Sequence, residues 1–139
     1  MAKSVSEVMT SKVCSIDADK TVAYAAKMMK DENVGFAPIV EGDRLVGTVT
    51  DRDIAVKAVA EGKDPQTTSV REIAETDIVT VEPGQGLDDA LQLMASHQIR
   101  RLPVVEQDRK LVGVVAQADV AKEAKAKEVG EMVEEISAQ

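Results

Sequence analysis

Thr50 and Asp53 are the residues whose types and spacing most directly point to chemistry. They stand three positions apart, directly after an apolar run, where a helix is expected to begin. A carboxylate in the first turn of a helix can accept hydrogen bonds from a bound molecule, while the Thr50 hydroxyl and nearby backbone N–H groups can face a phosphate. The same spacing predicts a capping box, in which each side chain bonds the other residue's backbone. Ligand binding and helix capping can coexist, and the sequence alone does not decide between them.

A matching carboxylate, Asp119, lies in the second half of the chain, but Ala116 stands there in the place of Thr50. Because alanine has no hydroxyl, it can neither cap a helix nor bind a phosphate through its side chain. The alternative for Asp119 is an ordinary carboxylate that interacts with the helix dipole. We therefore expect the binding site at the second segment to be empty, to bind its ligand more weakly, or to be specific for a different ligand.

The two segments correspond because the chain is a sequence repeated twice. At an offset of 65, Pro38-x-Val40-Glu41-x-Asp43-Arg44 matches Pro103-x-Val105-Glu106-x-Asp108-Arg109. Lys110 is an inserted residue, so later positions match at an offset of 66. The chain is thus divided into a first repeat at 4–60, a linker at 61–68, a second repeat at 69–126 and a C-terminal helical extension at 127–139.

Each repeat reads as a strand, a helix, two strands and a helix, which gives an α+β fold. The expected strands are the apolar runs 13–16, 36–40 and 45–49, with counterparts at 78–81, 101–105 and 111–115. Helical spacing predicts helices from Val22 and Leu87, from Asp51 to Ala60, and from Gln117 onward. Pro38 and Pro103 favour edge positions for their strands, because proline has no N–H to donate to a central ladder.

One β-α-β-β-α unit is too small to bury its sheet well alone. We therefore expect the two repeats to pack sheet to sheet about a pseudo-twofold axis, with related clefts where loops of one repeat meet the other. A stripe of Val129, Met132, Val133 and Ile136 predicts a C-terminal helix. Helices exposed by such a pair suit a symmetric homodimer contact.

Composition excludes several classes of function. The 17 basic and 25 acidic residues give a net charge of −8, which argues against nucleic-acid and membrane-surface binding. The single cysteine, Cys14, and the single histidine, His97, allow neither an internal disulfide nor the usual zinc ligands, which fits a reducing cytoplasm. No apolar run approaches the length of a membrane span. No catalytic triad or Walker-type loop is present, so we expect neither an enzyme nor a required cofactor.

The repeat order, the Pro-containing strands and the G-x-x-T-x-x-D segment at 47–53 resemble tandem cystathionine-beta-synthase (CBS) domains. The resemblance covers both repeats. Residues 50–54, followed by Gly62-Lys63-Asp64-Pro65, are most similar to small stand-alone bacterial pairs of the hypoxic-response type. The resemblance implies a regulatory module whose clefts accept an AMP-, ADP- or ATP-type adenosine nucleotide, with S-adenosylmethionine and NAD(H) as alternatives.

The resemblance also assigns roles to particular residues. Asp53 and Asp119 would accept hydrogen bonds from ribose hydroxyls, and Thr50 would face the ribose or a phosphate. The adenine slot would be lined by Val13, Val34, Phe36, Ala37 and Pro38 in the first repeat and by Ile78, Ile99 and Leu102 in the second. The nearby cations that would meet a phosphate are Lys12, Arg52, Arg100 and Arg101. The alternatives are core packing for the apolar residues and solvated surface charge for the cations.

The leading hypothesis is therefore a nucleotide sensor that acts in trans. Ligand binding would change the orientation of the repeats or subunits, and a separate effector protein would read that change. The alternative is a ligand-independent dimeric interaction or stress scaffold. Ala116 favours the scaffold, whereas Thr50 with Asp53 favours sensing.

Overall fold

The computed structural model describes residues 3–123, which form two compact units of mixed helix and strand. The first-repeat unit consists of residues 12–78 and 105–111. The second-repeat unit consists of residues 3–11, 79–104 and 112–123 of the described chain. The expected α+β fold class is confirmed, and the helix expected at 127–139 lies outside the described residues.

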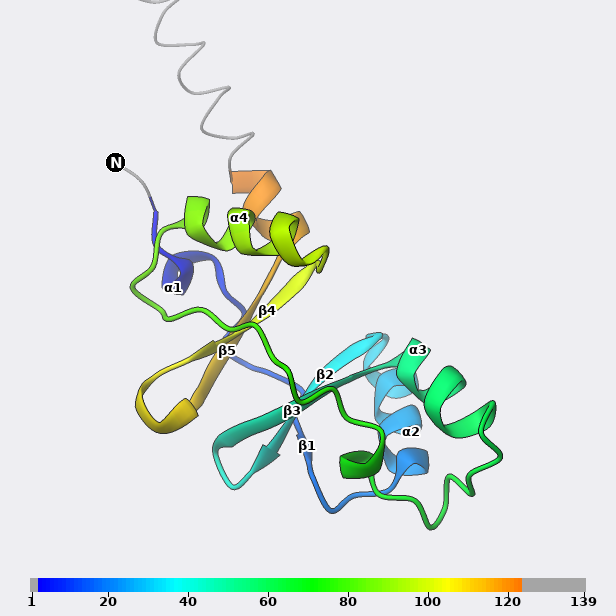
Figure 1. Cartoon of the computed structure of the whole chain (residues 1–139). Helices are drawn as coiled ribbons and strands as arrows, with labels where there is room; N and C mark the ends of the chain where they lie inside the picture. Colours follow the sequence, from blue (N-terminus) through cyan, green and yellow to red (C-terminus); the bar gives the residue numbers. More distant parts are fainter. Residues whose placement is uncertain (1–2, 124–139) are drawn as a thin grey trace, which may run out of the picture. The chain divides into compact units, whose positions relative to one another are not determined.

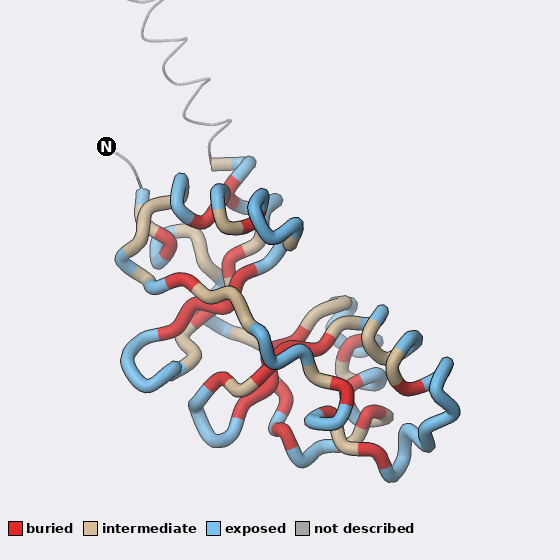
Figure 2. The backbone as a smooth tube through the Cα atoms, in the orientation of Figure 1, coloured by how far each residue is buried: buried red, intermediate tan, exposed pale blue. Residues whose placement is uncertain are grey.

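The first-repeat unit is built on a three-stranded sheet with the order β1-β2-β3. Strand β1 (Ile16–Asp17) runs parallel to β2 (Phe36–Glu41), which pairs antiparallel with β3 (Arg44–Thr50). The helical elements of this unit are α2 (Val22–Glu32), α3 (Asp51–Asp53) with its π-helical continuation η1 (Ile54–Val59), and the 3-10 turn η2 (Val70–Glu72). Figure 2 shows that β2 and β3 are mostly buried.

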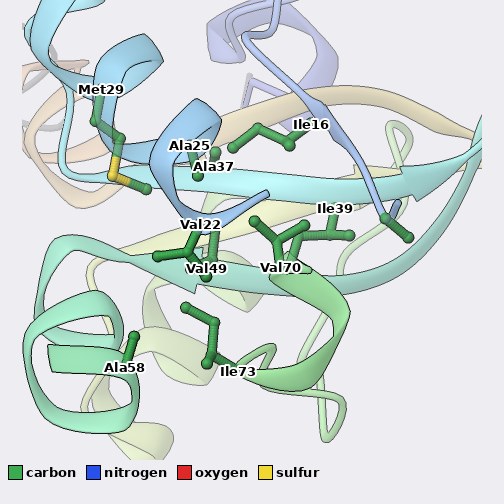
Figure 3. Close-up of a cluster of buried hydrophobic side chains, with 11 residues drawn as sticks. Ile16, Val22, Ala25, Met29, Ala37, Ile39, Val49, Ala58, Val70 and Ile73 are labelled. Atoms are coloured by element: carbon green, nitrogen blue, oxygen red, sulfur yellow. The ribbon is translucent and has the colours of Figure 1, made fainter. Parts of the chain in front are cut away.

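Helix α2 forms where the sequence predicts it, because its apolar residues share one face and both ends are capped. The Thr21 hydroxyl accepts a hydrogen bond from the Tyr24 N–H at 3.1 Å, and Asn33 ends the helix in the left-handed conformation. Its inward face meets the sheet residues Ala37, Ile39 and Val49 (Figure 3). The helix residues in this core are Val22, Ala25 and Met29.

The second-repeat unit repeats this arrangement around a two-stranded hairpin. Its elements are α1 (Val5–Val8), α4 (Leu87–His97), β4 (Arg101–Val105) and β5 (Leu111–Ala116), and residues 117–123 are helical. The 3-10 turn η3 (Gln107–Arg109) lies between the two strands in sequence and, with Val105 and Leu111, belongs to the first-repeat unit. The core of the unit consists of Val5, Val81, Ala90, Met94, Leu102, Val104, Val115 and Val120.

The leading segment of each repeat packs in the unit of the other repeat. Val5, in α1, is fully buried in the core that contains α4 (Figure 1), while Val70 and Ile73 are buried in the core of the first-repeat unit. The backbone contacts correspond as well. The Val5 N–H donates to the Gln85 carbonyl, and the Val70 N–H donates to the Lys20 carbonyl, both at 2.8 Å. The compact units and the repeats of the sequence therefore have different bounds.

Two glycines make room for these leading segments, one at Glu75 and one at Thr10. Thr48, next to Gly47 in β3, exchanges two backbone hydrogen bonds with Glu75, at 3.0 and 2.9 Å. A Cβ placed on Gly47 would lie 3.1 Å from the Glu75 carbonyl oxygen, and one on Gly113 would lie 2.9 Å from that of Thr10. Close approach of the two backbones thus requires glycine at 113 and leaves little room for a Cβ at 47.

Three expectations about local structure were wrong. The run 13–16 forms a strand only from Ile16, and in the run 78–81 only Val81 pairs, through an isolated bridge. Strand β2 is central, although it contains Pro38. The proline is tolerated because its partner Thr48 directs its own N–H and carbonyl to Glu75, and the pairing with β1 begins only at Ile39.

Candidate functional site

Thr50 and Asp53 form a complete capping box at the start of α3. The Thr50 N–H donates to Asp53 Oδ2 at 2.9 Å, and the Asp53 N–H donates to Thr50 Oγ1 at 3.1 Å. The capping role that the sequence predicted is therefore confirmed. Because both side chains are held by the backbone, the carboxylate keeps one orientation.

Lys57 occupies the other oxygen of the same carboxylate, one helical turn further on. Its ammonium lies 3.2 Å from Asp53 Oδ1, and the Asp53 side chain is only 18% exposed. The sequence interpretation did not identify this residue, although a spacing of four along a helix is the signal for such a pair. The carboxylate is thus fixed in orientation and partly neutralised.

The entrance to this helix brings together the start of β2 and the end of β3. Phe36, half-buried, lies directly opposite Thr50 in the ladder, and the Asp51 N–H donates to the Gly35 carbonyl at 3.1 Å. A Cβ on Gly35 would lie 2.9 Å from the Asp51 carboxylate, so a larger residue there would make this side chain shift. Of the apolar residues expected here, Phe36 is therefore the one that the structure places beside Thr50.

The other expected residues of this unit divide between surface and core. Lys12 and Arg52 are exposed, Val34 is 38% exposed, and Val13 is half-buried. Core packing, the alternative for the apolar residues, accounts for Ala37, which is fully buried opposite Val49. Pro38 is also buried, and Ile78, expected with the second repeat, falls in the first-repeat unit and is half-buried.

The second-repeat unit has a related helix start without the cap. The Gln117 N–H donates to the Arg100 carbonyl at 2.7 Å, which places Arg100 next to the helix that carries the exposed Asp119. Arg101 is exposed, Ile99 packs against the core, and Leu102 is fully buried within it. No ion pair to Asp119 occurs among residues 3–123.

The structure also bears on Cys14, metals and membranes. Burial raises the pKa of the Cys14 thiol, and the nearby Glu32 carboxylate raises it further, so the thiol is not activated. Within the described residues, no three His, Cys, Asp or Glu side chains gather where they could hold a metal ion. None of the helices in that part of the chain is long and apolar enough to cross a membrane.

The family model of the CBS domain matches the chain twice, at residues 5–59 and 70–126. The two matches include the described elements of both repeats, together with both G-x-x-x-x-x-D segments that lead into the helices at 51 and 117. The chain therefore belongs to the CBS domain family and carries two copies of the domain.

Similar proteins include small bacterial members of the family. The chain is 48% identical over 118 residues to the CBS domain-containing protein YhcV of Bacillus subtilis, covering 85% of this chain and 83% of that protein. It is 38% identical over 117 residues to hypoxic response protein 1 of Mycobacterium tuberculosis, covering 84% and 81%. The expected similarity to the stand-alone hypoxic-response type is thus confirmed.

Solved structures share the fold. Hypoxic Response Protein I with two coordinated zinc ions matches with a TM-score of 0.80 and 35% identity, covering 87% of this chain and 98% of that one. The CBS domain pair of protein MJ0100, in complex with methylthioadenosine and S-adenosyl-L-methionine, matches with a TM-score of 0.81 and 26% identity, covering 91% and 99%.

Proposed function

We propose that this chain is a regulatory module that binds an adenosine-containing ligand at the start of the helical segment 51–59. The observation that carries the proposal is the Asp53 carboxylate, which is partly buried and held in one orientation by its own capping box. A fixed carboxylate suits the two neighbouring hydroxyls of a ribose, since each charge-assisted hydrogen bond can contribute about 1.5–3 kcal/mol. The related pair MJ0100 supports this class of ligand through its two adenosine compounds.

We expect the first repeat to bind the ligand more tightly than the second. Thr50 supplies a hydroxyl there, and Phe36 supplies apolar surface directly opposite it. In the second repeat Ala116 removes the hydroxyl, while Arg100 and Arg101 offer cations. We expect an AMP- or ATP-type nucleotide in the first repeat, with S-adenosylmethionine or NAD(H) as the alternative ligands and no role in catalysis.

Signalling would occur in trans through a homodimer and a separate effector protein. Val56 and Val59 are 48% and 67% exposed on the helical segment 51–59, and we propose that they meet a second copy of this chain. A ligand can switch such an assembly only if it binds two conformations with different affinity. Val59→Glu should convert a dimer to a monomer in sedimentation, with the melting temperature of the fold kept.

A melting panel with AMP, ATP, S-adenosylmethionine and NADH tests the proposed function. A ligand present at about 100 times its Kd stabilises the folded state by about 2.7 kcal/mol, which raises the melting temperature by several degrees. We expect a shift with at least one compound, lost for the most part in Asp53→Asn and reduced less in Asp119→Ala. No shift with any compound would favour the alternative, a ligand-independent dimeric scaffold, in which Asp53 serves only its capping box and Lys57.

A further inference from the structure

Both oxygens of the Asp53 carboxylate already have partners inside the protein. Oδ2 accepts the Thr50 N–H at 2.9 Å, and Oδ1 lies 3.2 Å from the Lys57 ammonium. A ribose hydroxyl that donates to Oδ1 must therefore share that oxygen with Lys57 or displace it. We propose that Lys57 is a specificity-determining residue, which makes the first repeat prefer phosphorylated adenosine ligands to the bare nucleoside. This inference rests on the proposed function.

The preference depends on whether the ligand brings an anion that can replace Asp53 as the partner of the Lys57 ammonium. The Lys57 side chain is 41% exposed, and a lysine has a flexible stem with three donors at its end, so it can turn away from Asp53 without moving the helix. A nucleoside that takes its place offers no anion in exchange. A nucleotide does, because its phosphate is attached to the same ribose and the flexible Lys57 stem can turn toward it. The ion pair is then replaced rather than lost.

The neighbouring cation Arg52 is not paired with the same carboxylate. Arg52 is exposed, and within residues 3–123 the ion pair of Asp53 is made by Lys57. In the second repeat, the position that matches Lys57 is Glu123, whose carboxylate is held by Lys3 at 2.7 Å. An acidic residue four positions after Asp119 cannot exchange its partner for a phosphate, so the proposed selectivity belongs to the first repeat alone.

Calorimetric titration of adenosine and of AMP into the full chain tests the proposal. Wild type should prefer AMP. Lys57→Gln should weaken AMP binding about tenfold, equivalent to about 1.4 kcal/mol, and should strengthen adenosine binding a few-fold because no ammonium competes for the carboxylate. Lys57→Arg should keep the preference. Lys27→Gln, which removes the same charge from an exposed position in α2, should change neither affinity.

The outcomes separate this inference from the function on which it rests. If both ligands bind and Lys57→Gln changes their affinities equally or not at all, Lys57 does not determine specificity. Asp53→Asn would still lower both affinities in that case, and the proposed function would stand. If neither ligand binds to wild type, the proposed function fails and the inference fails with it.

Discussion

Thr50 caps the helical segment 51–59, whereas the matching helix of the second repeat follows Ala116. Thr50→Ala should lower the free energy of unfolding by about 1 kcal/mol, because the Asp53 N–H loses its acceptor. Ala116→Thr should raise it by up to about 1 kcal/mol by completing a box with Asp119. Urea unfolding measures both changes.

The control for the cap is Ala118→Thr, which places the same side chain inside the helix rather than before it. A β-branched residue there has no backbone group to cap, and it slightly disfavours the helix. Equal stabilisation by Ala116→Thr and Ala118→Thr would mean that position 116 does not act as a cap.

Cys14 gives a prediction about pH. Burial, with a further contribution from the Glu32 carboxylate, raises the pKa of the thiol, so less thiolate is present at any given pH than in a free peptide. The rate of iodoacetamide alkylation should therefore reach its midpoint at a higher pH than that of a cysteine peptide. Glu32→Gln should move the midpoint down only part of the way, because burial is the larger cause. A midpoint below that of the peptide would contradict this environment.

At the scale of elements, the contact of β5 with the leading segment of the first repeat, at Met9 and Thr10, leaves no room for a side chain at Gly113. A Cβ on Gly113 would lie 2.6 Å from Met9 Sδ and 2.9 Å from the Thr10 carbonyl oxygen, and the backbone atom cannot turn away as a side chain can. Gly113→Ala should cost about 1–3 kcal/mol in the free energy of unfolding. Gly47→Ala should cost less, since its nearest contacts are 3.1 Å.

Gly84→Ala is the matched control for these glycines, because nothing lies within 4 Å of its Cβ position. It should leave the stability unchanged or slightly raised, since alanine restricts the unfolded chain. A loss at Gly84 as large as that at Gly113 would show that the effect is not steric.

The helices and hairpins could be predicted from the sequence because their signals are local. Val22, Ala25 and Met29 repeat at helical spacing, and the apolar runs 36–40 and 45–49 are separated by a short polar turn. The packing of α1 in the other repeat's unit could not be predicted. Since the leading segments of the two repeats are alike, the same pattern satisfies packing within a repeat or across repeats.

Only part of the candidate site could be predicted from the sequence. The spacing of Thr50 and Asp53 indicated both a cap and a binding carboxylate, and the cap is confirmed. The burial of Ala37 and Leu102 could not be predicted, because an apolar residue in a strand reads the same whether it lines a slot or fills a core. Residue types alone therefore overstate the apolar lining of the proposed site.

For the molecule as a whole, the central claim is that the charge of Asp53 holds the ribose of an adenosine ligand. The direct measurement is calorimetric titration of AMP into wild type and Asp53→Asn. Asparagine can still accept the Thr50 N–H, so the cap and the melting temperature of the free protein should be kept while the charge is lost. The account predicts saturable binding to wild type and at least about tenfold weaker binding to the variant. Equal affinity of the two proteins for AMP would contradict it.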